Sequence, residues 1–222
     1  MAAVDVGVQH GWGFGAWSWD AWRGLMPVGF VLHAPDRGYF GQRVDMDPLR
    51  PQIVVAHSLG LHLLAPAWFA AAELVVVVSS FGSFHSRDTK QAWYSRRTVE
   101  RMLVRLESEP EALLSDFYTR SCAPRVSSLA VSEPVCTERL RVDLELLQES
   151  EFEPERVAAE SQVLFLHGSD DRIVPLERSE ELHGRISGST MSVLEGAGHM
   201  LPITHARECW REIERVWCRM RS

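Results

Sequence analysis

The chain has 222 residues, a length typical of one domain, and its 30 acidic residues outnumber its 23 lysines and arginines to give a formal charge of −7. This balance argues against a nucleic-acid-binding protein, which needs a basic surface to displace counterions. No apolar run reaches the length of a membrane span, and the N-terminal residues lack the basic and apolar regions of a leader peptide. We therefore expect a cytoplasmic protein with no nucleic-acid or membrane partner.

The cysteines form no C-x-x-C pair. In a cytoplasmic protein this pattern predicts reduced structural thiols and no metal site. The four positions are Cys122, Cys136, Cys209 and Cys218.

The first predicted strand covers Val4–Gln9 and runs into His10-Gly11-Trp12-Gly13. Acyl transfer needs two backbone N–H groups directed at the oxyanion, and one of them comes from a loop at the end of a neighbouring strand. The N–H of Trp12 is the candidate for this donor. The alternative is a glycine turn with an aromatic side chain packed beside it.

A second strand is predicted at Val28–Leu32, and the next strand, Gln52–Ala56, turns directly into Ser58. A strand, a serine flanked by small residues and then an apolar helix are typical of a nucleophile elbow. Gly60 provides the small residue after the serine, but Ala56 stands where the usual pattern has glycine. We predict Ser58 as the nucleophile and the N–H of Leu59 as the second oxyanion donor. The alternative is a serine that caps an ordinary buried helix.

The helix after the elbow is apolar nearly all round as far as Phe69, and Pro66 predicts a kink in it. An uninterrupted apolar strand follows at Leu74–Val78, and later strands are predicted at Val163–Leu166 and Met191–Leu194. Strands that alternate with helices predict an α/β fold with a doubly wound, mostly parallel sheet and helices on both faces. Residues 82–159 show no strand pattern, so we predict a helical cap inserted into a single domain of residues 1–222.

One helix of the predicted cap carries a charged stripe. In residues 95–107 the apolar side chains fall on one face, and Arg97, Arg101 and Arg105 fall on the opposite face. Such a stripe can dock an acidic partner. The alternative is a solvated face that Glu100 and Glu107 balance.

Two aspartates follow the strand at Val163–Leu166, in the place where the acid of a Ser-Asp-His triad lies. Asp171 fits the spacing G-x-x-D-x-x-V-P, and Asp170 is the other candidate. The last predicted strand leads into a loop of small residues that carries His199, which completes the chain order Ser, Asp, His. From Thr204 onward an amphipathic pattern predicts a covering helix.

With these residues in place, the chain resembles the α/β-hydrolase superfamily over nearly its whole length. Within it, the sequence is similar to the pimeloyl-acyl-carrier-protein methyl ester esterases of biotin synthesis. H-G-W-G at residues 10–13 and R-T-V-E-R at residues 97–101 match motifs of that family. Ser79-Ser80, followed by Phe84, Ser86, Arg87 and Asp88, is similar to its S-S-x-x-F-S-x-R-D segment. The chain departs from that family in its elbow, A-H-S-L-G-L instead of G-W-S-L-G-G, and it begins at the oxyanion strand, so we expect the N-terminal hairpin of the fold to be missing.

This resemblance implies a cofactor-free serine carboxylesterase that hydrolyses the methyl ester of pimeloyl-acyl-carrier-protein. It assigns Ser58, Asp171 and His199 to catalysis, and it implies that Arg97 and Arg101 bind an acyl carrier protein. We expect a monomer. The alternatives are a general short-chain carboxylesterase whose cap arginines face water, and a hydrolase-fold ligand receptor with little turnover.

Overall fold

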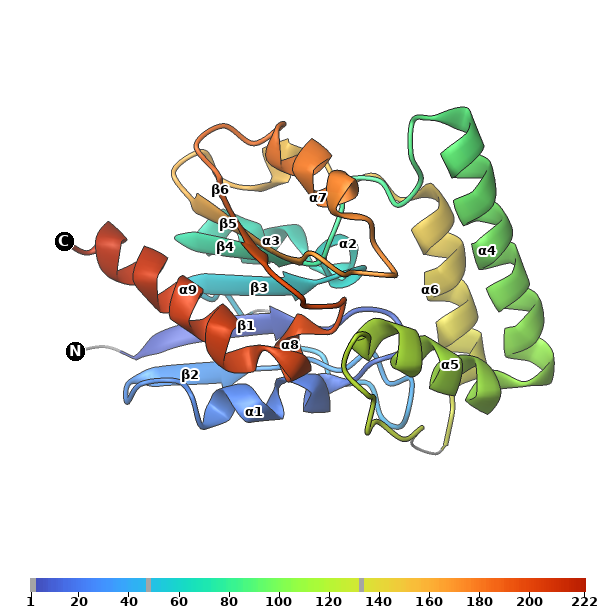
Figure 1. The fold of residues 1–222 in the computed structure, drawn as a ribbon. Coiled ribbons are helices and arrows are strands. Elements are labelled where there is room, and N and C mark those ends of the chain that lie inside the picture. The colour runs from blue at the N-terminus through green and yellow to red at the C-terminus, as the bar shows by residue number, and fades with distance from the viewer. Residues whose placement is uncertain (1–2, 47–48, 132–133) are drawn as a thin grey trace.

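The computed structural model describes residues 3–46, 49–131 and 134–222. Its six strands form one wholly parallel sheet in the order β2-β1-β3-β4-β5-β6 (Figure 1). The strands are β1 (Val4–Gln9), β2 (Phe30–His33), β3 (Ile53–His57), β4 (Leu74–Val78), β5 (Gln162–Gly168) and β6 (Thr190–Leu194). The six predicted strands are confirmed, with ends that differ by two residues or fewer.

Helices cover both faces of this sheet. One face carries η1 (Ala16–Trp19), α1 (Asp20–Arg23), α8 (Leu201–Thr204) and α9 (Ala206–Met220), and the other carries α2 (Gly60–Leu63), α3 (Pro66–Ala71) and α7 (Leu176–His183). The predicted α/β architecture with helices on both faces is therefore confirmed. The covering helix at the C-terminal end of the chain is also present as α9.

The apolar strands are buried on both sides because their side chains alternate between two cores. Ile53 and Val55 of β3 belong to the core under α9, whereas Val54 and Ala56 belong to the core under α3. All four side chains are fully buried. This explains why the central strands are continuous apolar runs without polar alternation.

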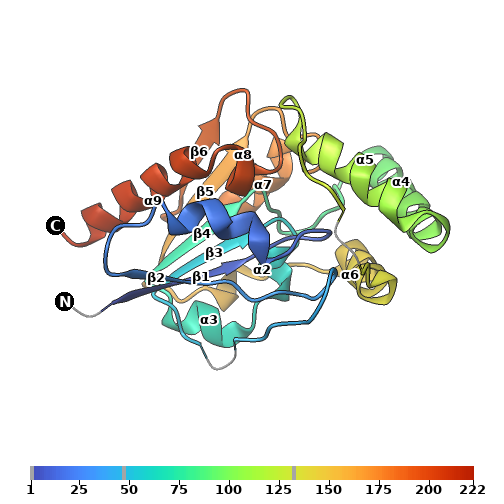
Figure 2. The same ribbon diagram turned by 90° about the horizontal axis from the view of Figure 1, so that it is seen from below.

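The described residues of the segment 82–159 form helices, connecting loops and an isolated bridge between Ser83 and Glu151. Its cap helices are α4 (Thr89–Ser108), α5 (Pro110–Cys122) and α6 (Thr137–Glu149), followed by η2 (Pro154–Arg156). Both views show the three cap helices at one side of the sheet, away from both chain ends (Figures 1 and 2). They enclose a third apolar core that includes Trp12 and Leu59.

Polar contacts tie the cap helices to the loops at the carboxyl edge of the sheet. Arg37, after β2, makes a bidentate ion pair with Asp143 of α6, with N–O distances of 2.9 and 2.6 Å. The buried Tyr39 hydroxyl donates to the same carboxylate. The Trp12 indole N–H donates to the carbonyl oxygen of Leu140 at 2.8 Å. These contacts fix α6 above the strand ends.

The predicted helix after the elbow is interrupted and not merely kinked. It consists of α2 and α3, and the backbone of Leu64 and Ala65 between them is extended. A residue before proline is driven out of the helical region, and proline is favoured at the first position of a helix. Pro66 therefore ends one helix and begins the next.

The approach of α2 to the end of β1 depends on Gly60. A methyl group at this position would lie 2.6 Å from the Gln9 carbonyl oxygen and 2.8 Å from that of His10. Because both neighbours are backbone atoms, we expect Gly60→Ala to lower the free energy of unfolding by about 1–3 kcal/mol, measured by urea denaturation. Gly24→Ala is the matched control, since a methyl group there meets nothing within 4 Å. It should change stability by no more than about 0.5 kcal/mol, and equal effects of both substitutions would contradict the role of Gly60.

Candidate active site

The structure brings three predicted residues together at the carboxyl edge of the sheet. Ser58 follows β3, Asp171 lies in the turn after β5, and His199 lies in the loop after β6. The strand register aligns the ends of β1, β3, β4 and β5, so the loops that follow them meet in one place. Ligands of parallel sheets bind at this edge.

Ser58 occupies a sharp turn between β3 and α2. Its φ is +55°, in the left-handed region that L-residues rarely adopt. Two hydrogen bonds hold its backbone. The Ser58 N–H donates to the Val78 carbonyl oxygen at 2.9 Å, and the Ser80 hydroxyl donates to the Ser58 carbonyl oxygen at 2.7 Å. The loop after β1 packs closely against Ser58 at Gly11. A methyl group at Gly11 would lie only 2.9 Å from Cβ of Ser58. The predicted elbow geometry is therefore present.

A series of hydrogen bonds links the three side chains. Nδ1 of His199 lies 2.7 Å from Oδ2 of Asp171, and Nε2 of His199 lies 3.1 Å from Oγ of Ser58. An ionised carboxylate only accepts hydrogen bonds, so Nδ1 carries the proton and Nε2 of the neutral ring accepts from the Ser58 hydroxyl. The side chains of His199 and Asp171 are 0% and 1% exposed. This arrangement can draw a proton from the serine hydroxyl when a carbonyl group approaches.

The two candidate aspartates differ in their surroundings. Asp171 points inward, and its Oδ1 accepts hydrogen bonds from the N–H groups of Ile173 and Val174 at 2.8 and 2.9 Å. Asp170 is exposed and contributes its backbone N–H to the Ala197 carbonyl oxygen. Only Asp171 contacts the imidazole of His199.

His57 contributes to the site in a way that the sequence did not reveal. Its ring is fully buried with its centroid 4.8 Å from that of His199, and its Nε2 donates to the His199 carbonyl oxygen at 3.0 Å. Burial lowers the pKa of His57 well below its usual value, and the electrostatic effect of the neighbouring His199 lowers it further. A neutral His57 therefore supports the loop that carries His199. In the sequence, this role was indicated only by the position of His57 directly before Ser58.

The proposed oxyanion donors both line the cavity beside Ser58. Among the described residues, no acceptor is bonded to the backbone N–H of Trp12 or of Leu59. An unpaired N–H at the wall of such a cavity can donate to a developing oxyanion.

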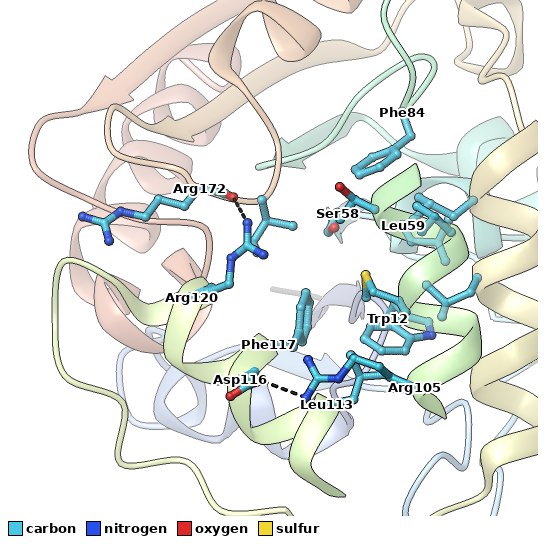
Figure 3. Close-up of a pocket in the computed structure, with 16 residues that line it drawn as sticks. Trp12, Ser58, Leu59, Phe84, Arg105, Leu113, Asp116, Phe117, Arg120 and Arg172 are labelled. Atoms are coloured by element: carbon cyan, nitrogen blue, oxygen red, sulfur yellow. Dashed lines mark hydrogen bonds and ion pairs between the residues drawn. The ribbon is translucent and has the colours of Figure 1, made fainter. Parts of the chain in front are cut away.

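The cavity itself has a volume of about 120 Å³ and lies between the elbow and the cap helices (Figure 3). Figure 3 shows the Ser58 hydroxyl, the rings of Phe84 and Phe117 and the indole of Trp12 around it. Further apolar walls come from Leu59, Val99, Met102, Leu113, Leu144, Leu147 and Ile173. Its charged rim comprises Arg105, Asp116, Arg120 and Arg172. The surface next to Ser58 thus suits an apolar acyl group.

The arginine stripe of α4 is only partly as expected. Arg97 and Arg101 are exposed, and Arg97 pairs with Glu100 at 3.1 Å. Arg105 is turned toward the cavity rim, where it pairs with Glu109 at 2.8 Å and Asp116 at 2.9 Å. The expectation that Arg105 shares the outward face of the other two is therefore wrong, because these carboxylates draw its guanidinium to the rim.

Comparison with solved structures identifies the fold. An esterase from Exiguobacterium antarcticum superposes with a TM-score of 0.81 at 16% identity, over 97% of this chain and 92% of that one. The chain has the α/β-hydrolase fold. A bromoperoxidase from Bacillus anthracis shares this α/β-hydrolase fold with a TM-score of 0.78 at 19% identity, over 98% and 92% of the two chains. Neighbours with such different names show the fold and leave the activity open.

Two sequence comparisons agree with the α/β-hydrolase fold. A family model described as "TAP-like protein" matches residues 127–215. A curated relative from Aromatoleum aromaticum, named pimeloyl-[acyl-carrier protein] methyl ester esterase, is 25% identical over 97% of this chain and 99% of its own length. This relative bears the name of the family that the motifs resemble.

Two structural features are absent from the described part of the chain. No helix there combines the length and the apolar character that crossing a membrane requires. Likewise, no group of three or more His, Cys, Asp or Glu side chains in the described ranges is arranged to hold a metal ion.

Proposed function

We propose that the chain is a serine carboxylesterase. The observation that carries this proposal is the hydrogen-bonded series from Oγ of Ser58 through His199 to Asp171. A nucleophile, a base in contact with it and a carboxylate that orients the base form the arrangement that acyl transfer uses on several unrelated folds. The esterases among the structural neighbours are consistent with the proposal.

In the proposed reaction, Oγ of Ser58 attacks the ester carbonyl carbon and its proton passes to Nε2 of His199. The tetrahedral adduct collapses, the proton moves to the departing methoxide, and methanol leaves an acyl group on Ser58. A water molecule then gives a proton to His199 and adds to the acyl carbonyl, which releases the carboxylic acid and restores the serine. Asp171 holds the ring and stabilises its charged form. Trp12 and Leu59 donate their N–H groups to the oxyanion.

For the substrate, we propose the methyl ester of pimeloyl-acyl-carrier-protein. The support comes from the named relative and from the R-T-V-E-R motif, which places Arg97 and Arg101 on an exposed helix face. Arginines there can pair with carboxylates of an acidic carrier. In this role the enzyme is a monomer, acts in the cytoplasm and needs no cofactor.

A second candidate is a general esterase for short acyl chains. It is favoured by the limited size of the cavity beside Ser58, about 120 Å³, and by its apolar walls. A short acyl group fits this space without movement of the cap helices.

The two aspartates give a matched test of the proposed chemistry. We expect Asp171→Asn to lower kcat for a nitrophenyl ester by about 10⁴-fold, because the amide favours the wrong tautomer of His199. Asp170→Asn should leave kcat unchanged, since Asp170 makes no contact with the ring. Steady-state kinetics on both purified variants provides the measurement. A loss of the same size in both, or in Asp170→Asn alone, would contradict the assignment.

The substrate proposal is tested by reversing charge on α4. Arg97→Glu with Arg101→Glu should lower kcat/KM for the carrier-linked methyl ester roughly tenfold or more, because two contacts to carboxylates become repulsive. A nitrophenyl ester should be hydrolysed as before. Arg211→Glu with Arg219→Glu, at two exposed positions on α9, makes the same change in net charge and is the matched control. If the double variant of α4 keeps its activity on the carrier-linked ester, the docking role fails and the short-chain esterase remains.

A further inference from the structure

A second cavity of about 540 Å³ lies where the cap meets the rest of the fold. Its walls come from the segment before α4, from α4 itself, from α7 and from the segment after α6. Figure 1 shows α7 beside the segment that leads into α4. The lining residues are Gly82, Ser83, His85, Ser86, Arg87, Arg96, Glu151, Arg178, Glu181, Leu182 and Arg185.

The residues that line this cavity carry a net positive charge, although the chain as a whole is acidic. Four arginines and two glutamates line it, which gives a formal charge of +2, whereas the whole chain carries −7. Arg185 pairs with Glu151 at 3.2 Å and with Glu153 at 3.5 Å, and Arg178 pairs with Glu181. Within the described residues, Arg87 and Arg96 have no carboxylate partner. Two guanidinium groups from different segments therefore face the same space without a counter-charge.

Arg178 is a buried part of the cavity wall. Its side chain is 7% exposed, and its five N–H donors have two acceptors among the described residues, the His85 carbonyl oxygen at 3.4 Å and the Glu181 carboxylate. None of its nitrogen atoms is both buried and without a partner, so the donors left over are accessible from the cavity and can pair with a further acceptor. An anion in the cavity would supply one.

His85 is a second buried polar group in the wall. Its Nδ1 donates to the Ser95 hydroxyl at 2.7 Å, and its Nε2 is buried without a partner among the described residues. Burial and the neighbouring Arg96 lower the pKa of His85 to about 4. The ring is therefore neutral near pH 7, and its Nε2 is free to accept a hydrogen bond from a hydroxyl group.

We propose that this cavity binds a small polar phosphate monoester, with the phosphate held by Arg87, Arg96 and Arg178. A phosphate monoester carries about −1.5 to −2 charges near pH 7, which matches the uncompensated charge. Guanidinium groups from three segments suit a tetrahedral anion with three terminal oxygens. The volume exceeds that of a phosphate alone, and the serine hydroxyls of Ser83 and Ser86 suit a hydroxylated body.

The phosphate site is separate from the proposed active site. None of its lining residues lines the cavity beside Ser58. Ser58→Ala should therefore leave phosphate binding unchanged, and binding is measured without any enzymatic turnover. Failure of the esterase proposal and failure of the phosphate site are thereby distinguishable.

The test is calorimetric titration of the full chain with glucose 6-phosphate, with glucose, succinate and sodium chloride at matched ionic strength as controls. Glucose 6-phosphate should bind, and the three controls should not. Arg87→Ala with Arg96→Ala should weaken its affinity at least tenfold, because two guanidinium contacts are lost. Both side chains are exposed, so the double variant should fold, and circular dichroism checks this. Arg211→Ala with Arg219→Ala, which removes two exposed arginines from α9, should bind like the unaltered chain.

Three results would overturn the proposal. The first is a heat of titration for glucose 6-phosphate that is no larger than the heat for sodium chloride. The second is undiminished affinity in the Arg87→Ala, Arg96→Ala variant, which would place the anion elsewhere. The third is equal affinity for succinate, which would make the cavity a carboxylate site.

Discussion

The close packing at the end of β3 is the constraint on which the proposed active site depends. Ser58 adopts a positive φ, and this conformation holds only because the surrounding backbone fixes it. Gly60 permits α2 to approach the end of β1, and Gly11 permits the loop after β1 to approach Ser58 itself. The same contacts that strain the serine backbone therefore place its hydroxyl within reach of His199.

Burial then determines the electrostatics around this serine. Three histidine rings, those of His57, His167 and His199, are fully buried, and the rings of His167 and His199 lie 3.4 and 2.7 Å from the Asp171 carboxylate. Desolvation lowers the pKa of His57 and of His167, so these rings stay neutral and act as hydrogen-bond donors to backbone carbonyl groups. Of these three rings, the imidazole of His199 is the one that contacts both the Asp171 carboxylate and the Ser58 hydroxyl.

Much of the fold and the three proposed catalytic positions could be predicted from the sequence, because apolar runs and the chain order Ser, Asp, His are local signals. Long-range contacts could not. The helix after the elbow breaks at Pro66, since the residue before a proline resists the helical conformation. Arg105 has the spacing of an outward stripe, yet Asp116 of the next helix draws it to the cavity rim. The support that His57 gives to His199, and the basic cavity between α4 and α7, each join segments far apart in the chain.

The central claim is that His199 activates Ser58 as a nucleophile, and covalent labelling with a fluorophosphonate tests it most directly. Such a reagent phosphonylates an activated serine at a rate that depends on its base. Mass spectrometry of the intact chain and its peptides should find one label, on Ser58, formed rapidly in the unaltered protein and at a small fraction of that rate in His199→Ala. Labelling of another residue, or an unchanged rate in His199→Ala, would contradict the account.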